Sequence, residues 1–416
     1  MGLPLATAFA ETGTDVLGVD VSAEKVASVN AGTSYVEDVA SAELARHVQN
    51  GCLRASTDPS GLRECDAILI CLPTPLDEHR NPDLTYVIAG AEMAAANLGP
   101  DALVVLESTT YPGTTREVVK PILEREGRHV GTDVFLAFSP ERVDPGNGTY
   151  GVRNTPKVVG GLTDACTQRA AELYGRICET VHVVSSPESA EMAKILENTF
   201  RAVNIALVNE MAILSDRMGI DLWESIDAAS TKPFGYMPFW PGPGLGGHCI
   251  PIDPFYLTWR AKAYDLSTEF VELAGRINTN MPYYAVSRVI RALNQCGVAT
   301  RDAKILLLGV AYKPNVSDMR ESPSLKLLSL LRGEGIEVRY HDPHVPELRA
   351  EGLRSVPLTD EQLAWADAVV IATDHRSVDY GPVVSKAKRI VDLRNAVRRS
   401  RGAGPAGPIP DNVDVL

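Results

Sequence analysis

The sequence predicts an α/β protein in which two doubly wound domains are joined by a helical central domain with one long helix. Short apolar runs of strand length alternate with helical stretches at both ends of the chain, and one long helical pattern lies between them over residues 186–219. The 416 residues are 45% hydrophobic, which is enough to fill more than one core. We therefore expect domains over residues 1–185, 186–300 and 301–416.

The first domain is expected to contain a parallel sheet. Its strand candidates are apolar enough to be buried on both faces, and helical stretches separate them. The strands are expected at residues 15–20, 67–72, 103–106 and 134–138, and the helices near residues 3–12, 22–31 and 84–98.

The central helix and the last domain are predicted in the same way. Ser186 suits the helix cap and Pro187 the first turn. Apolar residues then follow helical spacing at Met192, Ile195, Leu196, Val203, Leu207, Met211 and Leu214. A second α/β unit is predicted from strand candidates at residues 303–309, 336–340, 368–372 and 389–392.

Charge and cysteine usage exclude several classes of protein. The net charge of −13 argues against a protein that binds the phosphate backbone of nucleic acids. Seven widely spaced cysteines without a Cys-x-x-Cys pair argue against a disulfide framework or a zinc site. No apolar run approaches the roughly 20 residues that span a bilayer, and no signal peptide is apparent. We expect a cytoplasmic protein with no metal, no membrane contact and no nucleic-acid partner.

The loop at residues 241–254 is the strongest candidate for chemistry. It places Cys249 after the glycine pair Gly246 and Gly247, and four residues before the carboxylate Asp253. Glycine allows a close backbone approach to a ligand, and proline keeps the loop rigid. A structural cysteine is normally found in an apolar helix or strand. We interpret Cys249 as a nucleophile.

Hydroxyl groups follow two of the predicted strands. Thr74 follows one strand, and Ser108 and Thr109 follow another, so all three are expected at the ligand crevice of a doubly wound sheet. Capping of a helix is the favoured alternative for any single hydroxyl, and Thr114 or Thr115 is expected to cap the helix that begins at Arg116. The loop position shifts the balance toward ligand binding for Thr109.

Glu141 follows the next strand and is a candidate general base or a ligand for a substrate hydroxyl. The alternative is a solvated turn with an ion pair between Arg142 and Asp144.

Lys194 and Asn198 are four residues apart in the long helix, so they project from one face. Together they are able to donate hydrogen bonds to an oxyanion. From spacing alone we favour the alternative, an exposed ion-pair ladder that consists of Glu191, Lys194 and Glu197.

The segment at residues 309–323 combines a loop that contains Lys313 and Arg320 with a helix that begins at Ser322. Two cations beside a helix N-terminus are a plausible phosphate site. A cluster of salt bridges is the structural alternative, and the two are compatible.

The start of the chain resembles part of a dinucleotide-binding turn. Gly2 corresponds to the last glycine of a Gly-x-Gly-x-x-Gly turn, and Asp20 ends the next strand, where an acidic residue binds an adenosine ribose and disfavours NADP. The alternative is an ordinary helix followed by a strand that ends at a capping aspartate, and the local sequence favours neither. The preceding strand and first two glycines are absent, so we expect exposed neighbouring strand edges and a misplaced start site.

Three segments, at residues 190–198, 246–253 and 311–323, resemble the UDP-glucose/GDP-mannose dehydrogenases in sequence and order. These are NAD-dependent, four-electron nucleotide-sugar 6-dehydrogenases. The resemblance covers nearly all of residues 1–400 and implies two Rossmann-like domains, the first for NAD and the last for the UDP-sugar. Residues 230–236 and 242–257 look most similar to the UDP-N-acetylglucosamine branch, and Ile252 stands where UDP-glucose enzymes usually have lysine.

The resemblance implies a role for each candidate. Cys249 would capture the sugar aldehyde as a thiohemiacetal, which is then oxidised to a thioester and hydrolysed to the uronic acid for polysaccharide biosynthesis. Lys194 and Asn198 would stabilise oxyanions, which reverses the preference for a ladder, while Asp253 would act on water with help from Glu141 and Thr109. NAD would be bound by Gly2, Asp20, Lys25, Thr74, Ser108, Thr109 and Arg320, and the substrate by Lys194, Asn198, Gly246, Lys313 and Arg394.

The resemblance also implies a homodimer or a higher homo-oligomer that is built on the central helix. The same chemistry on UDP-glucose or UDP-N-acetylmannosamine is the nearest alternative. An alternative of another class is an N-terminally truncated, inactive protein that binds nucleotide sugars or forms oligomers.

Overall fold

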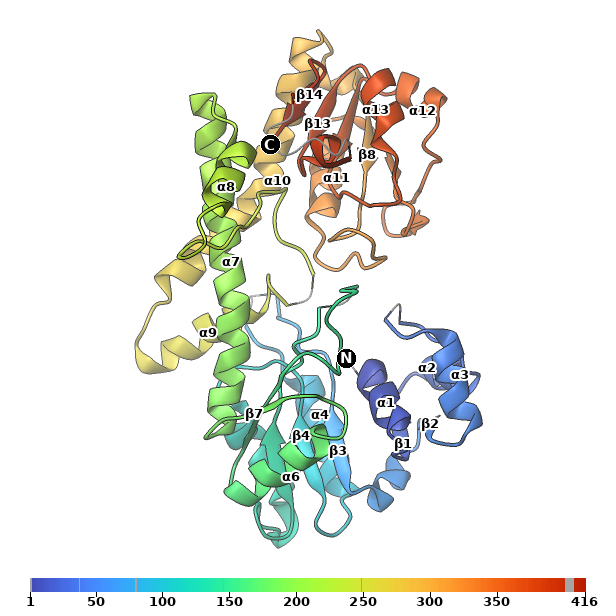
Figure 1. Cartoon of the computed structure of the whole chain (residues 1–416), viewed down its shortest axis with the longest axis vertical. Helices are drawn as coiled ribbons and strands as arrows, with labels where there is room; N and C mark the ends of the chain where they lie inside the picture. The colour runs from blue at the N-terminus through green and yellow to red at the C-terminus, as the bar shows by residue number, and fades with distance from the viewer. Residues whose placement is uncertain (1, 37, 79–80, 145, 248, 401–407) are drawn as a thin grey trace. The chain divides into compact units, whose positions relative to one another are not determined.

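The computed structural model describes residues 2–36, 38–78, 81–144, 146–247, 249–400 and 408–416. The chain divides into two compact units (Figure 1). The first comprises residues 1–197 and 255–267, and the second comprises residues 198–254 and 268–416. Met1 and His248, which belong to two of the motifs above, lie outside the described residues.

The first unit contains a five-stranded sheet in the order β3-β4-β5-β6-β7. All neighbours are parallel except β5 and β6, which pair antiparallel. The strands are β3 (Ala67–Ile70), β4 (Leu103–Leu106), β5 (Phe135–Phe138), β6 (Lys157–Gly161) and β7 (Val181–Val183). The helices and helical turns of this unit include α1 (Gly2–Glu11), α2 (Ala23–Asn30), α3 (Ser41–Gln49), η1 (Pro59–Glu64), α4 (Thr85–Ala96), η2 (Thr115–Val119), α5 (Lys120–Leu123), η3 (Arg125–Gly127), α6 (Asp164–Tyr174) and η4 (Lys262–Tyr264).

Both faces of this sheet are buried, as its apolar strands predict. Along β4, Val104 and Leu106 pack in one core with residues of α4 and α5. Leu103 and Val105 pack in another core with residues of α1 and α6. Alternation along a strand directs successive side chains to opposite faces, so a strand with four buried residues needs a layer of helices on each side.

Two strands of the first unit form a separate sheet. β1 (Val16–Val19) pairs only with β2 (Leu53–Ser56) among the described strands, and β3 pairs only with β4. The expected open strand edges are therefore present. Helix α1 packs with both groups, because Leu5 lies in the core of the five-stranded sheet while Leu3 packs with Leu53 of β2.

The second unit contains a parallel five-stranded sheet in the order β14-β13-β12-β8-β9. Its strands are β8 (Lys304–Leu308), β9 (Glu337–His341), β12 (Ala368–Ile371), β13 (Ile390–Asp392) and β14 (Val413–Val415), with a small hairpin of β10 (Glu347–Leu348) and β11 (Leu353–Arg354). Its helices and helical turns include α8 (Leu222–Ser230), α10 (Glu269–Gln295), η5 (Thr300–Asp302), α11 (Pro323–Gly333), α12 (Asp360–Trp365), α13 (Tyr380–Lys386) and α14 (Ala396–Ser400).

The order of these strands creates a switch point between β8 and β12. The chain leaves β8 toward β9 on one side, and it later adds β12 on the other side. Helices α10 and α11 cover one face of the sheet, where they pack with Ile305 and Leu307, and α12 and α13 cover the other, where Leu306 and Leu308 are buried. In such sheets ligands bind outside the carboxyl ends of the strands at the switch point.

Two helices contribute residues to both units. The long helix α7 (Pro187–Met218) begins at the proline expected in its first turn, and α9 (Asp253–Ala261) begins at Asp253. The predicted fold class is confirmed, with two five-stranded α/β sheets and a long central helix. The expected strands lie within one or two residues of their predicted positions, but the strand expected at residues 15–20 pairs in the separate two-stranded sheet and not in the first five-stranded sheet.

Candidate active site

The residues expected at the site fall into both compact units. In the first unit they lie on the loops after β3, β4 and β5 and on the first turns of α7. These loops leave the carboxyl ends of neighbouring parallel strands, where the sheet of a doubly wound domain binds ligands.

Ser108 ties the ends of β3 and β4 together. Its hydroxyl donates to the Leu72 carbonyl at 2.8 Å and accepts from the Leu72 N–H at 2.9 Å. Thr74 and Thr109 are buried, and the buried hydroxyl of Thr110 has no hydrogen-bond partner within the described chain. The Ser108 hydroxyl therefore holds the loop, whereas Thr110 offers an unused donor next to Thr109.

The expected capping by Thr114 or Thr115 is wrong. The Thr114 hydroxyl donates to the Tyr111 carbonyl at 2.8 Å. The carboxylate of Glu191 on α7 instead accepts from the N–H groups of Gly113 at 2.6 Å and Thr115 at 2.9 Å, and from the Thr115 hydroxyl at 2.7 Å. Sequence spacing missed this cap because Glu191 follows the loop by more than 70 residues.

The exposed ladder of Glu191, Lys194 and Glu197 is also wrong. Glu191 is fully buried and Lys194 is only 7% exposed. Glu197 pairs with Arg142 at 2.7 Å. The helix face that contains Glu191 and Lys194 therefore packs against loops of the first unit.

Glu141 lies on one of these loops. Its carboxylate accepts from the N–H groups of Arg142 at 2.8 Å and Val143 at 2.7 Å, and its carbonyl accepts from the Lys194 ammonium at 2.5 Å. Arg142 forms its ion pair with Glu197 of α7, so the turn is anchored to the helix. Lys194 and Glu141 are thus in direct contact within the first unit.

A buried charged cluster connects the loops after β4 and β5, and it was not predicted from the sequence. Lys157 of β6 donates to the Glu107 carboxylate at 2.7 Å and to the Pro140 carbonyl at 3.2 Å, and the Tyr174 hydroxyl donates to the other oxygen of Glu107. Burial opposes the charge on Lys157, but Glu107 and Glu141 outweigh it and raise the Lys157 pKa. The available signal was the position of Glu107, a carboxylate that directly follows a strand with both faces buried.

Asp20 presents a carboxylate at the carboxyl end of β1. One oxygen accepts from the Ser22 N–H at 2.8 Å, and the other lies 3.4 Å from the Lys25 ammonium. Side-chain exposure of 36% for Asp20 and 50% for Lys25 leaves this carboxylate accessible to the hydroxyls of a ribose. Gly2 begins α1, and a Cβ there would meet only an ordinary contact with Cys71 at 3.7 Å. The residues present therefore fit NAD through Asp20, while the structure does not require glycine at position 2.

In the second unit, the Cys249 loop packs closely against the loop that follows β8. A Cβ on Gly246 would lie 2.7 Å from the Cβ of Tyr312, and Gly247 has a positive φ of 86° that suits glycine. The Gly247 N–H donates to the Arg320 carbonyl at 3.0 Å. The side chain of Cys249 is exposed, and its thiol is close enough to Arg320 to interact electrostatically. The structure thus brings Gly246, Cys249 and Arg320 together.

Asp253 and Asn198 form a buried pair. The Asn198 amide donates to the Asp253 carboxylate and accepts from the Arg201 guanidinium, and neither Asn198 nor Asp253 is more than 2% exposed. The Asp253 N–H donates to the Cys249 carbonyl at 2.8 Å. This turn fixes the carboxylate one helical turn after the cysteine.

The basic candidates have acidic or aromatic partners. Arg320 pairs with Asp318 at 2.6 Å, and the hydrogen bonds that its guanidinium donates to that carboxylate raise the Arg320 pKa. Lys313 lies over the ring of Tyr312 at 5.7 Å, and Arg394 pairs with Asp374 at 3.3 Å. The salt-bridge alternative therefore applies in part, although cations still gather at the carboxyl ends of β8, β12 and β13.

A buried Asp–His pair, also missed from the sequence, holds the loop that contains Lys313. One oxygen of Asp342 accepts from the N–H groups of Val310 at 2.8 Å and Ala311 at 3.1 Å and lies 3.0 Å from His375 Nε2. His375 Nδ1 accepts from the Asn315 N–H at 3.0 Å, so the neutral ring carries its proton on Nε2. Burial would raise the Asp342 pKa, but hydrogen bonds from His375 and the backbone lower it. Asp342 directly follows β9, a position that the sequence shows.

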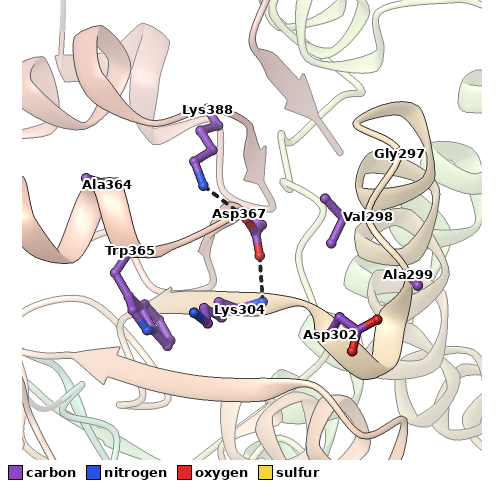
Figure 2. A pocket seen from close by; sticks show the side chains of 9 residues that line it. All are labelled: Gly297, Val298, Ala299, Asp302, Lys304, Ala364, Trp365, Asp367 and Lys388. Carbon is purple, nitrogen blue, oxygen red and sulfur yellow. Dashed lines mark hydrogen bonds and ion pairs between the residues drawn. The ribbon is translucent and has the colours of Figure 1, made fainter.

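The second unit also contains a cavity of about 620 Å³ at the opposite, amino-terminal edge of its sheet (Figure 2). Asp367 lies between the Lys388 ammonium and the Lys304 N–H, each at 3.0 Å, so both of its oxygens have donors. The cavity lies at the start of β8 and β12, away from the carboxyl ends where the candidate residues gather. It is not the candidate site.

Comparison with known proteins identifies relatives along the whole chain. Models of the UDP-glucose/GDP-mannose dehydrogenase family match at residues 1–178 (NAD binding domain), 188–280 (central domain) and 306–399 (UDP binding domain). The chain is 36% identical over 391 residues to a UDP-N-acetyl-D-mannosamine dehydrogenase of Escherichia coli (strain K12), which covers 90% of this chain and 91% of that protein.

Two further relatives cover most of the chain. A UDP-N-acetyl-D-glucosamine 6-dehydrogenase of Pseudomonas aeruginosa is 36% identical over 83% of this chain and 81% of that protein. The structure of a UDP-D-ManNAc dehydrogenase from Pyrococcus horikoshii matches with a TM-score of 0.88 at 32% identity, covering 100% of this chain and 96% of the other. Within the described residues, no helix is long and apolar enough to cross a bilayer.

Proposed function

The chain belongs to the UDP-glucose/GDP-mannose dehydrogenase family of NAD-dependent enzymes, and we propose that it oxidises C6 of a UDP-N-acetylhexosamine to the uronic acid through a thioester on Cys249. The observation that carries the proposal is the exposed thiol of Cys249 on a loop packed against the segment with Lys313 and Arg320. A thiol on a loop beside basic side chains supports a nucleophile that acts next to a bound UDP-sugar.

The chemistry requires two oxidations and one hydrolysis. When bound, NAD supplies the hydride acceptor for each oxidation. Between them, the sulfur of Cys249 forms a C–S bond to the aldehyde carbon while the carbonyl oxygen takes up a proton. After the second oxidation, water attacks the thioester, the C–S bond breaks and the sulfur takes back a proton. Covalent attachment keeps the aldehyde in place between the two oxidations.

The other candidate residues have supporting roles in this proposal. Lys194 and Asn198 donate hydrogen bonds to the oxyanions that form at C6. Asp253 accepts a proton from the attacking water, and Glu141 and Thr109 orient the sugar hydroxyl and water. Asp253 and Asn198 are already hydrogen-bonded to each other, which supports a shared role.

Binding roles follow the three segments expected from the sequence. Residues 1–185 bind NAD through Asp20, with Gly2, Lys25, Thr74, Ser108, Thr109 and Arg320 as further cofactor contacts. Residues 301–416 bind the UDP-sugar through Lys313 and Arg394, with Gly246 from the Cys249 loop. Residues 186–300 form the central domain. All seven cysteines are free thiols, which supports a reducing compartment such as the cytoplasm.

Two N-acetylated sugars are the leading substrates. The sequence of the Cys249 loop, with Ile252 where UDP-glucose enzymes usually have lysine, favours UDP-N-acetylglucosamine over UDP-glucose. UDP-N-acetylmannosamine is the second candidate, because the 36% identity to the E. coli mannosamine enzyme extends over 90% of the chain. A relative named for the mannosamine sugar and a relative named for the glucosamine sugar are each 36% identical to this chain, so an assay is needed to distinguish the two substrates.

The test is turnover of the purified chain with NAD and each UDP-sugar in separate reactions. We expect two NADH for each uronate formed. Cys249→Ser should lower the rate of uronate formation by about 1,000-fold, because the hydroxyl is a far weaker nucleophile. Cys296→Ser, at the other exposed cysteine, serves as the control and should keep the wild-type rate.

Full activity of Cys249→Ser would disprove the covalent mechanism. Wild-type protein that forms no NADH with any UDP-sugar, while still binding UDP, would instead support the inactive binding protein.

We further propose that the protein is a homodimer. Four large apolar side chains of α7 are 45–60% exposed, and they recur at spacings that place them on one stripe of the helix: Phe200, Leu207, Leu214 and Met218. Apolar surface of this extent on a helix favours a protein–protein contact.

A further inference from the structure

Glu191 is a buried carboxylate that faces only neutral donors. Its Oε2 accepts from the Gly113 N–H at 2.6 Å, and its Oε1 accepts from the N–H and hydroxyl of Thr115 at 2.9 and 2.7 Å. Within the described chain it has no ion pair. A carboxylate without a cation is costly to bury, and hydrogen bonds offset that cost only in part. The position is therefore poorly explained by stability alone.

The three bonds join helix α7 to the loop that follows Ser108 and Thr109. Gly113 presents its N–H from a positive φ of 109°, which suits glycine, so the backbone here is shaped to face the carboxylate. Thr115 begins the helical turn η2, where unpaired N–H groups favour a negative charge. Glu191 thus fixes the distal end of the Thr109 loop to one position on α7.

The turn of α7 that contains Glu191 also contacts the loop after β5, which contains Glu141. Lys194 lies three residues after Glu191, and its ammonium donates to the Glu141 carbonyl at 2.5 Å. The buried Lys157 ammonium links the loops after β4 and β5, because it donates to both the Glu107 carboxylate and the Pro140 carbonyl. Thr109, Glu141 and Lys194 therefore lie on three elements that are braced to one another within the first unit.

We propose that Glu191, in its anionic form, is a positioning residue that sets the place of Lys194 relative to the Thr109 loop. This inference rests on the proposed function, in which Lys194 and Thr109 serve the reaction. All three partners of Glu191 donate, so a carboxylate, which only accepts, is able to hold all three at once.

The test compares Glu191→Gln with Glu188→Gln. Glu188 lies one turn earlier on α7 and binds Arg116 at 2.6 Å, but its side chain is 31% exposed. For Glu191→Gln we expect a fall in kcat of about tenfold or more with KM for the UDP-sugar within about twofold, because a misplaced Lys194 weakens transition-state contacts. Glu188→Gln should change neither value by more than about twofold.

Amide hydrogen exchange gives a readout that does not depend on activity. The N–H groups of Gly113 and Thr115 should lose about tenfold or more of their protection in Glu191→Gln, and keep it in Glu188→Gln. If Glu191→Gln fails to fold, Thr115→Val removes one of the three bonds, and it should show a smaller fall in kcat with the same unchanged KM.

Two results would overturn the inference. One is wild-type kcat in Glu191→Gln, whether or not the amides lose protection. The other is unchanged protection of both amides, which would show that the carboxylate does not hold the loop. A wild-type protein without turnover would instead refute the proposed function, and the exchange experiment would still decide whether Glu191 fixes the loop.

Discussion

Glu188 and Glu191 stand one turn apart on α7, and their surroundings give them opposite behaviour. Burial would raise the Glu188 pKa, but the Arg116 guanidinium outweighs it and lowers that pKa. At Glu191 burial dominates the opposing hydrogen bonds from Gly113 and Thr115, and it raises the pKa to about 7. Deeper burial at Glu191 and the neighbouring Arg116 cation at Glu188, rather than the number of hydrogen bonds, make the difference.

This difference predicts how stability depends on pH. The Glu191 pKa is about 7 in the folded chain against an ordinary 4.5, so between these values the folded state binds more protons than the unfolded state. The contribution of this group to the free energy of unfolding is then largest below pH 4.5 and falls as pH rises toward 7, by on the order of 3 kcal/mol.

Urea unfolding of the wild type and Glu191→Gln between about pH 5 and 8 measures this effect. The wild type should lose stability relative to Glu191→Gln as pH rises. Glu188→Gln should run parallel to the wild type, because a lowered pKa moves its titration below this window. Parallel curves for the wild type and Glu191→Gln would contradict the raised pKa.

Local sequence indicates residue chemistry but not burial. Glu191 and Lys194 have the spacing of an exposed ion-pair ladder, and the same spacing occurs on a buried face. Only the packing of α7 against loops 76–78 residues earlier separates these two cases. The role of the glycines in the Cys249 loop was easier to predict from the sequence, because tight turns and close backbone approaches require glycine whatever the rest of the chain does.

At the scale of elements, α7 and α10 are joined by a buried amide pair in the second unit. The Asn209 amide donates to Asn278 at 2.9 Å and accepts from the Gly242 N–H at 3.0 Å. Asn278 in turn donates to the Ala202 carbonyl at 3.1 Å. Each amide has both a donor and an acceptor partner, so the pair fixes the register of the two helices at the base of the Cys249 loop.

Asn278→Ala should therefore destabilise the protein by about 1–3 kcal/mol, because it leaves the buried NH2 group of Asn209 without its acceptor. Denaturant unfolding measures the loss. Asn204→Ala is the matched control, since Asn204 donates to the Phe200 carbonyl of its own helix at an exposed site, and it should cost less than about 0.5 kcal/mol. Equal stability of Asn278→Ala and the wild type would show that the pair does not hold the helices.

Helix α10 also shows what an element-level prediction misses. It is absent from the helices expected from the sequence, and it contains Pro282, which normally indicates the end of a helix. Tertiary packing overrides that signal, because Met281, Ala285 and Val289 are buried against the second sheet. The strands were easier to predict, since a run buried on both faces is apolar throughout.

At the scale of the whole molecule, the sequence predicts the two five-stranded sheets, and it gives no signal for the point at which helix α7 passes from one compact unit to the other. The first segment of the first compact unit ends at Glu197, within a helix that is continuous in sequence and structure. Apolar spacing along α7 cannot reveal this division, because both sides of the helix are apolar. Ile195, Ala202 and Ala206 are buried, while Leu207 and Leu214 are exposed.

The exposed stripe of α7 leads to a prediction about assembly. A helix with two apolar sides needs a cover for each, and a second copy of the chain across a two-fold axis would cover the stripe with its own. A double substitution, Leu207→Glu with Leu214→Glu, would place four carboxylates in such an interface, each with a desolvation cost of several kcal/mol. Light scattering of the wild type should give twice the chain mass of 44.8 kDa, and the double variant should give the chain mass itself. Ser329→Glu, an added carboxylate at an exposed position of α11, should remain a dimer. A monomeric wild type, or a double variant that stays dimeric, would exclude this stripe as the interface.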